Sequence, residues 1–189
     1  MSNQSKMAID VLLAESFKEL AEKRPIERIT IKEITDKAGV IRPTFYNHFQ
    51  DKYELLEWIV QRELIDPMTP VIDRGDLTGA VTGALQMMEQ EKEFYIKAVR
   101  LEGQNSFKEI LLEKVTELIL NKLDGEKIEK KLSYPWLNSK RVAEFFAMTF
   151  CYAIVEWARD GMQVPIDDIV AVFVFLAVNS PVDMIEMIE

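Results

Sequence analysis

Residues 30–43, TIKEITDKAGVIRP, carry signals that favour two short helices separated by a tight turn. Thr30 followed by Glu33 is the capping-box pair that begins a helix. Gly39 ends that helix because glycine adopts the left-handed backbone conformation without strain. Pro43 fits only the first turn of a following helix. A helix of about two turns, a short turn with glycine and a second helix form a helix-turn-helix motif.

The rest of the chain shows the apolar spacing of helices. In the first helix Ile9, Leu12, Leu13, Phe17 and Leu20 share one face. Further helices are expected near 77–89, 91–102, 105–123, 139–160 and 166–178. The charged segment 124–136 is expected to be a mobile connection or an irregular helix end. We therefore predict an all-α protein.

We predict a helix-turn-helix domain over residues 1–50 and a larger helical domain for regulation and dimerisation over 67–189. A connecting helix over 51–66 joins the two. Asp51 caps this helix, with Glu54 at the box position.

The composition limits the compartment and the kinds of site. The only cysteine, Cys151, excludes an intrachain disulfide and a metal site built from several cysteines, and it fits the reducing cytoplasm. The N-terminus has acidic residues where a signal peptide would be apolar. No segment has the run of about 18 apolar residues that a membrane span needs. A cytoplasmic protein with no membrane partner is expected.

The net charge of −9 argues against strong non-specific binding to nucleic acid. Within residues 28–53, however, basic side chains outnumber acidic ones. The basic residues are Arg28, Lys32, Lys37, Arg42 and Lys52, against Glu33, Asp36 and Asp51. This lightly basic patch could contact phosphates in one orientation.

The second short helix of the motif combines a buried face with polar side chains of long reach. Phe45 and Phe49 are four residues apart and point to the core, while Arg42, Tyr46 and the only histidine, His48, lie around them. His48 has neither a nucleophile nor a His or Cys companion nearby in sequence, so catalytic and metal-binding roles are not favoured. We expect no cofactor and no metal.

The segment TIKEITDKAGVIRPTFYNHFQDKYELL resembles the DNA-binding domain of the TetR family of transcriptional regulators. The resemblance covers roughly residues 7–60 and extends more loosely to the last two helices. IRPTFYNHFQDKYELLEW is also similar to a subgroup that includes regulators of dihydroxyacetone kinase operons. One departure is Ile41, which stands where many members have a small capping residue and cannot cap through its side chain.

The resemblance and the chemistry of these side chains imply a DNA-binding surface. Its candidate residues are Thr30, Lys32, Arg42, Pro43, Thr44, Tyr46, Asn47, His48 and Lys52. Arg42 can fork onto a guanine and Thr44 can touch a base. Tyr46 and His48 look like phosphate contacts on the flank of the helix, and Lys52 adds its ammonium to free backbone amides. Alternatively, Tyr46 packs over the first helix, His48 has no role, and Lys32 and Lys37 are merely solvated.

The last two helices, VAEFFAMTFCYAIVEW and IVAVFVFLAV, are apolar on nearly all sides. Such helices must be buried all round, and a twofold dimer that pairs them into a four-helix interface would achieve this. A monomeric core is the alternative. A dimer would place two recognition helices on a palindromic double-stranded DNA operator.

In the TetR family the second domain usually binds an effector, here an unknown small molecule or protein. Candidate lining residues are Met87, Met88, Phe94, Tyr95, Phe107, Trp136, Phe146, Phe150 and Tyr152. Each of them fits a place in the helical core better than a ligand contact.

These observations favour a homodimeric DNA-binding transcriptional regulator, most simply a repressor, whose DNA affinity is controlled through the C-terminal domain. The alternative is a helical protein-interaction adaptor, or an activator of the same fold that depends on a coactivator. An enzyme is not expected, because the chain has no glycine-rich phosphate loop and no nucleophile–base pair.

Overall fold

The computed structural model describes residues 3–103, 105–123, 134 and 136–179. Throughout these residues the regular structure is helical, without strands, which confirms the all-α class. Most of the segment 124–136 lies outside the described residues.

The bounds of the helical elements follow in chain order. They are α1 (Asn3–Ala21), the 3₁₀ turn η1 (Ile26–Arg28), α2 (Ile31–Ala38), α3 (Arg42–Tyr46), α4 (Lys52–Ile59), the π-helical segment η2 (Val60–Ile65), α5 (Asp66–Ile72), α6 (Leu77–Gln90), α7 (Lys92–Ala98), α8 (Phe107–Lys122), α10 (Ser139–Arg159) and α11 (Ile166–Val178). The expected helices are therefore present, but α7 ends four residues earlier than 91–102 predicted.

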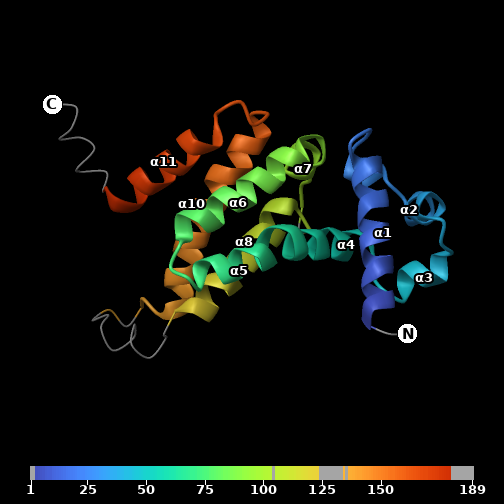
Figure 1. Ribbon diagram of the computed structural model, residues 1–189, viewed down its shortest axis with the longest axis horizontal. Coiled ribbons are helices and arrows are strands. Elements are labelled where there is room, and N and C mark those ends of the chain that lie inside the picture. The colour runs from blue at the N-terminus through green and yellow to red at the C-terminus, as the bar shows by residue number, and fades with distance from the viewer. Residues whose placement is uncertain (1–2, 104, 124–133, 135, 180–189) are drawn as a thin grey trace.

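The N-terminal helices form a small domain at one end of the molecule (Figure 1). α1 lies across the end of α4, and α2 and α3 lie on the far side of α1 from the C-terminal helices. Leu13 and Phe17 of α1, Ile34 of α2 and Phe45 of α3 are completely buried. Their apolar contacts fix the angles between the three helices.

A continuous helical run from Lys52 to Ile72 joins this domain to the rest of the chain. The run continues past residue 66, the end of the predicted connecting helix, and passes through both prolines of this stretch. Pro67 lies in the first turn of α5, directly after the π-helical segment η2, and Pro70 lies inside the helix. The segment η2, in the middle of this run, carries Glu63, which pairs with Lys18 of α1.

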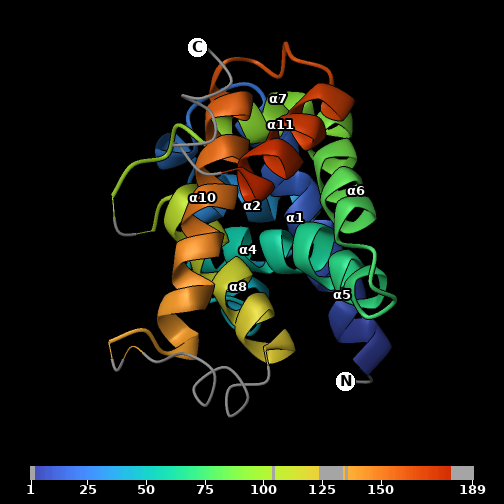
Figure 2. The same cartoon turned by 90° about the vertical axis from the view of Figure 1, so that its left-hand side faces the viewer.

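The C-terminal helices pack around this run (Figure 2). α8 lies along α10, and α6 contacts both α5 and α11. The rings of Phe150 in α10 and Phe173 in α11 meet edge to face with centroids 5.2 Å apart. No helix among the described residues is long and apolar enough to cross a membrane.

Large apolar side chains of α10 and α11 are left exposed to solvent. They are Phe145, Phe146, Met148, Tyr152, Val172, Val174, Phe175, Leu176 and Val178, and we call this set the α10–α11 apolar surface. An exposed surface of this kind is typical of a protein–protein contact.

Candidate nucleic-acid interface

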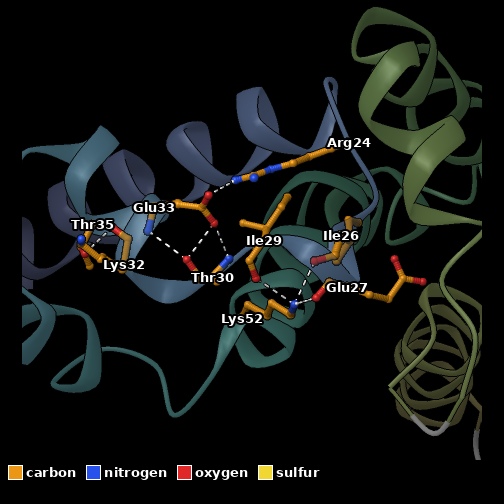
Figure 3. Close-up of polar contacts among 9 residues, drawn as sticks. All are labelled: Arg24, Ile26, Glu27, Ile29, Thr30, Lys32, Glu33, Thr35 and Lys52. Carbon is orange, nitrogen blue, oxygen red and sulfur yellow. Dashed lines mark hydrogen bonds and ion pairs between the residues drawn. The ribbon is translucent and has the colours of Figure 1, made fainter.

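Reciprocal hydrogen bonds between Thr30 and Glu33 fix the start of α2 (Figure 3). The Glu33 amide donates to Thr30 Oγ1 at 3.3 Å, and the Thr30 amide donates to Glu33 Oε2 at 2.9 Å. Arg24 Nη2 lies 2.7 Å from Glu33 Oε1. The hydrogen bonds from Thr30, followed by Arg24, lower the pKa of Glu33 to about 2. The predicted capping box is confirmed.

The turn and the start of α3 also follow the sequence. Gly39 has φ of +67°, the left-handed conformation that ends α2. Ile41 precedes α3 without a side-chain cap, and Pro43 lies in the first turn. Phe45 and Phe49 are buried. α3 contains only five residues and ends at Tyr46, before Phe49.

Most of the predicted DNA-binding residues are exposed on α2, α3 and their flanks. The exposed ones are Thr30, Lys32, Arg42, Pro43, Tyr46 and Asn47, and Thr44 is half-buried. Arg42 and Tyr46 are joined in the free protein, because Arg42 Nη2 donates to Tyr46 Oη at 3.2 Å. The guanidinium carbon lies 5.9 Å from the centroid of the tyrosine ring. The two side chains therefore form one hydrogen-bonded pair on the outer face of α3.

Lys52 is placed differently from the expectation. Its ammonium donates to the carbonyl oxygens of Ile26 at 2.9 Å, Glu27 at 2.7 Å and Ile29 at 2.8 Å (Figure 3). The backbone amides at the start of α4 are not free either, since Asp51 Oδ1 accepts from the amides of residues 53 and 54. The predicted anion site at the start of α4 is therefore already filled by groups of the chain itself.

The prediction that His48 lies on an exposed flank is wrong. Its side chain is only 3% exposed, and Nδ1 lies 2.6 Å from Oδ1 of Asp10, itself 9% exposed. The ring is also close to Phe49, with centroids 6.4 Å apart. This contact ties the turn after α3 to α1, and it was not predictable from the sequence because the two residues are 38 positions apart.

The remaining basic residues of the patch divide into paired and unpaired groups. Lys37 forms an ion pair with Glu19 of α1. Arg28 and Lys32 are exposed and have no acidic partner in the part of the chain that the structure describes. Unpaired exposed cations are the groups best able to contact phosphates.

One cluster was not foreseen from the sequence. Lys18 of α1 is almost completely buried, and its ammonium lies 2.6 Å from Glu63 in η2, 2.6 Å from Glu91 before α7 and 2.9 Å from Glu15. The hydroxyl of Tyr95 donates to Glu63 at 3.0 Å. The signal was available, because Lys18 follows Ala14 by four residues and so falls on the buried face of α1.

The charges of this cluster shift its pKa values. Burial disfavours the ammonium of Lys18, but the hydrogen bonds to Glu63, Glu91 and Glu15 outweigh it and raise the pKa of Lys18. Burial raises the pKa of Glu63, and Lys18 offsets this only in part. The carboxylates of Glu15, Glu63 and Glu91 are close enough to hold a cation, and the ammonium of Lys18 supplies one.

The candidate effector residues do not gather in one place. Met88, Phe94, Tyr95, Phe107 and Phe150 are packed in the core, whereas Trp136, Phe146 and Tyr152 are more than half exposed and Met87 is partly buried. A cleft of about 300 Å³ lies between α1, α4 and α8, and a second of about 310 Å³ lies between α4 and α8; none of the nine residues lines either. The predicted lining residues are therefore divided between the core and the surface of the described part of the chain.

Comparison with known proteins agrees with the geometry. Residues 16–59 match the family model described as "Bacterial regulatory proteins, tetR family". Residues 76–178, more than half of the chain, match the model described as "Transcriptional regulator C-terminal region".

Individual relatives are regulators as well. The chain is 26% identical over 142 residues to the HTH-type dhaKLM operon transcriptional activator DhaS of Lactococcus lactis subsp. lactis (strain IL1403), covering 74% of each protein. It is 47% identical over 53 residues to the uncharacterized HTH-type transcriptional regulator YxbF of Bacillus subtilis (strain 168), covering 26% of this chain and 14% of that protein.

Solved structures show the same fold. The structure of the dihydroxyacetone kinase operon activator DhaS aligns with a TM-score of 0.64 at 23% identity, over 90% of this chain and 94% of that one. NalD, the secondary repressor of the MexAB-OprM multidrug efflux pump in Pseudomonas aeruginosa, aligns with a TM-score of 0.59 at 16% identity, over 89% and 93%. These relatives are regulators and not enzymes, as predicted. The chain belongs to the TetR family of DNA-binding transcriptional regulators.

Proposed function

We propose that the protein binds a palindromic operator as a homodimer, through the exposed residues of α2 and α3. The observation that carries this proposal is the Arg42–Tyr46 pair on the outer face of α3, a helix held from behind by the buried ring of Phe45. Arg42 and Thr44 would read base edges, and Pro43 and Asn47 would lie against the groove. Tyr46, Thr30 and Lys32 would contact phosphates.

The α10–α11 apolar surface supports the homodimer. Its phenylalanine, tyrosine and aliphatic side chains are exposed in a single chain, and covering them with a second copy removes apolar area from water. α10 and α11 pack against each other through Phe150 and Phe173, so two copies would build a four-helix interface. We propose the division of each chain into residues 1–50, 51–66 and 67–189 for this arrangement.

We propose that an effector of the C-terminal domain, a small molecule or a protein, changes DNA affinity by moving α1. Lys18 and Phe17 connect α1 to the C-terminal helices, since Lys18 binds Glu91 and the ring of Phe17 meets that of Phe94 with centroids 6.2 Å apart. A displacement of α7 would therefore move α1 and, with it, α3.

The bound dimer could act as a repressor or as an activator of transcription. A dimer that occupies a promoter blocks transcription without any further surface, so we propose repression in the bacterial cytoplasm, where the chromosome lies. The relative DhaS is an activator, and this observation favours activation as the second candidate. Transcription in vitro from a promoter that carries the operator distinguishes the two by the sign of the change.

Selection of bound duplexes from a random DNA library tests the DNA-binding proposal directly. We expect an inverted repeat to be enriched and to bind far more tightly than random duplex, with affinity that falls steeply as salt rises. Recovery of duplexes with no common motif, or of a single half-site without its repeat, would contradict the proposal.

A further inference from the structure

We infer that Lys52 is a positioning residue for the DNA-binding surface and not a phosphate contact. The inference rests on the proposed function, because the surface that Lys52 would position is the one placed on DNA above. It concerns how the free protein holds that surface in shape.

Every N–H donor of the Lys52 ammonium has an acceptor within the protein. A lysine ammonium has three N–H donors and no acceptor. In Lys52 these three donors have three acceptors at hydrogen-bond distance, the carbonyl oxygens of Ile26, Glu27 and Ile29, at 2.7–2.9 Å. A phosphate could bind this ammonium only by displacing one of the carbonyls.

The acceptors are themselves fixed in place. Ile26 and Ile29 are each 1% exposed, so their backbone cannot move away from the ammonium without disturbing the core. Ile26 begins η1 and Ile29 caps its end, and the Ile29 amide donates to the Ile26 carbonyl at 3.0 Å. Carbonyl groups at the end of a helical turn carry partial negative charge and favour a cation.

The hydrogen bonds of Lys52 hold the backbone directly before Thr30, the N-cap of α2. Ile29 directly precedes Thr30, whose hydroxyl and amide make the capping box with Glu33. Figure 3 shows Lys52 on one side of this short stretch and Glu33 on the other. Lys52 belongs to the first turn of α4, so its hydrogen bonds hold α4 against the backbone that leads into α2.

Lys32 provides the contrasting case on the same surface. Its side chain is exposed and has no acidic partner within the described part of the chain. Removal of a phosphate contact lowers the slope of log affinity against log salt by about 0.9. Removal of a positioning residue lowers affinity at all salt concentrations alike and leaves the slope unchanged.

The experiment compares Lys52→Met, Lys52→Arg and Lys32→Met in the full-length protein. Two measurements are made, amide hydrogen exchange over residues 26–34 and DNA affinity as a function of KCl concentration, on a duplex recovered from the random library. Lys52→Arg keeps the charge, but a planar guanidinium does not match three carbonyls that converge on one nitrogen atom.

We expect both Lys52 variants to speed exchange over residues 26–34 and to weaken binding about tenfold with an unchanged salt slope. Lys32→Met should leave exchange unchanged and lower the slope. Unchanged exchange in Lys52→Met together with a lower slope, or wild-type affinity in Lys52→Arg, would overturn the inference. If the wild type recovers no duplex, the proposed function fails, and the exchange measurement alone decides whether Lys52 holds η1.

Discussion

The Nδ1 atom of His48 lies 2.6 Å from Oδ1 of Asp10, and this contact joins the turn after α3 to the middle of α1. Both side chains are more than nine-tenths buried. The orientation of α3 therefore depends on a carboxylate in a different helix.

We expect Asp10→Ala to reduce the free energy of unfolding by about 1–3 kcal/mol, because the buried imidazole loses its partner. Asp10→Asn retains an acceptor oxygen and should cost less. Urea unfolding measures both variants, and Asp36→Ala, an exposed acid of α2, is the control with little effect. Equal stability of Asp10→Ala and Asp36→Ala would show that the contact does not stabilise the fold.

Lys18→Met should reduce the free energy of unfolding at pH 7 by about 1–3 kcal/mol, since the partly buried carboxylates of Glu63 and Glu91 lose their counter-charge. The pKa of Glu63 is raised in the folded protein, so protonation of Glu63 favours the folded state and its ionisation opposes it. The defect of Lys18→Met should therefore be largest at neutral pH and shrink as the pH falls below the folded pKa of Glu63.

Urea unfolding of wild type and Lys18→Met between pH 5 and 8 tests this dependence. Lys37→Met, which breaks the surface pair with Glu19, is the matched control and should change stability far less than Lys18→Met at all pH values. A defect of Lys18→Met that grows toward low pH would contradict the assigned role of Glu63.

Thr30→Ala should raise the pKa of Glu33 from about 2 toward the ordinary carboxyl value, because the largest cause of its lowering is the hydrogen bond from the Thr30 hydroxyl, which alanine lacks. A lowered pKa stabilises the fold above the unfolded carboxyl pKa and loses that effect as the pH falls through the folded value. NMR titration of the Glu33 carboxyl carbon measures the shift. Thr30→Ser keeps the hydroxyl and should keep the low pKa.

Arg42→Ala should cost about 1–3 kcal/mol of binding free energy at one base pair and relax the preference there. Tyr46→Ala should weaken binding to all duplexes alike. Affinity measured on the selected operator and its single-base variants separates the two patterns. Identical patterns would mean that the Arg42–Tyr46 pair acts as one unit, against the separate roles proposed for its members.

Leu176→Asp should shift the protein from dimer to monomer, because Leu176 is 47% exposed on the α10–α11 apolar surface. Sedimentation analysis measures the mass. Met7→Asp, which changes an exposed apolar residue of α1 at the other end of the molecule, should leave the dimer intact. A wild type that stays monomeric at micromolar concentration would rule out the proposed interface.

The structure also shows which features were predictable from the sequence. The limits of α2 were, because Thr30, Glu33 and Gly39 act within a few residues of one another. The partners of His48 and Lys18 were not, because Asp10 and Glu91 lie 38 and 73 positions away and meet them only through tertiary packing.

The role of Lys52 shows the same limit. A lysine in the first turn of a helix favours an anion-binding site. The folded structure shows instead that the ammonium already donates to carbonyl oxygens 23–26 residues earlier in the chain. The exposed positions around Arg42 were predictable, because a buried Phe45 fixes which side of a short helix faces outward.

Because α3 is short, the number of base pairs that it could contact in a DNA duplex is small. Five residues at 1.5 Å each span about 7.5 Å, which corresponds to roughly two steps between base pairs 3.4 Å apart. Two subunits that each distinguish about three base pairs together specify about six base pairs. A sequence of that length recurs by chance about once in 4,000 positions. Specificity for a single chromosomal site would then also depend on the fixed separation of the two α3 helices and on the bendability of the DNA between them.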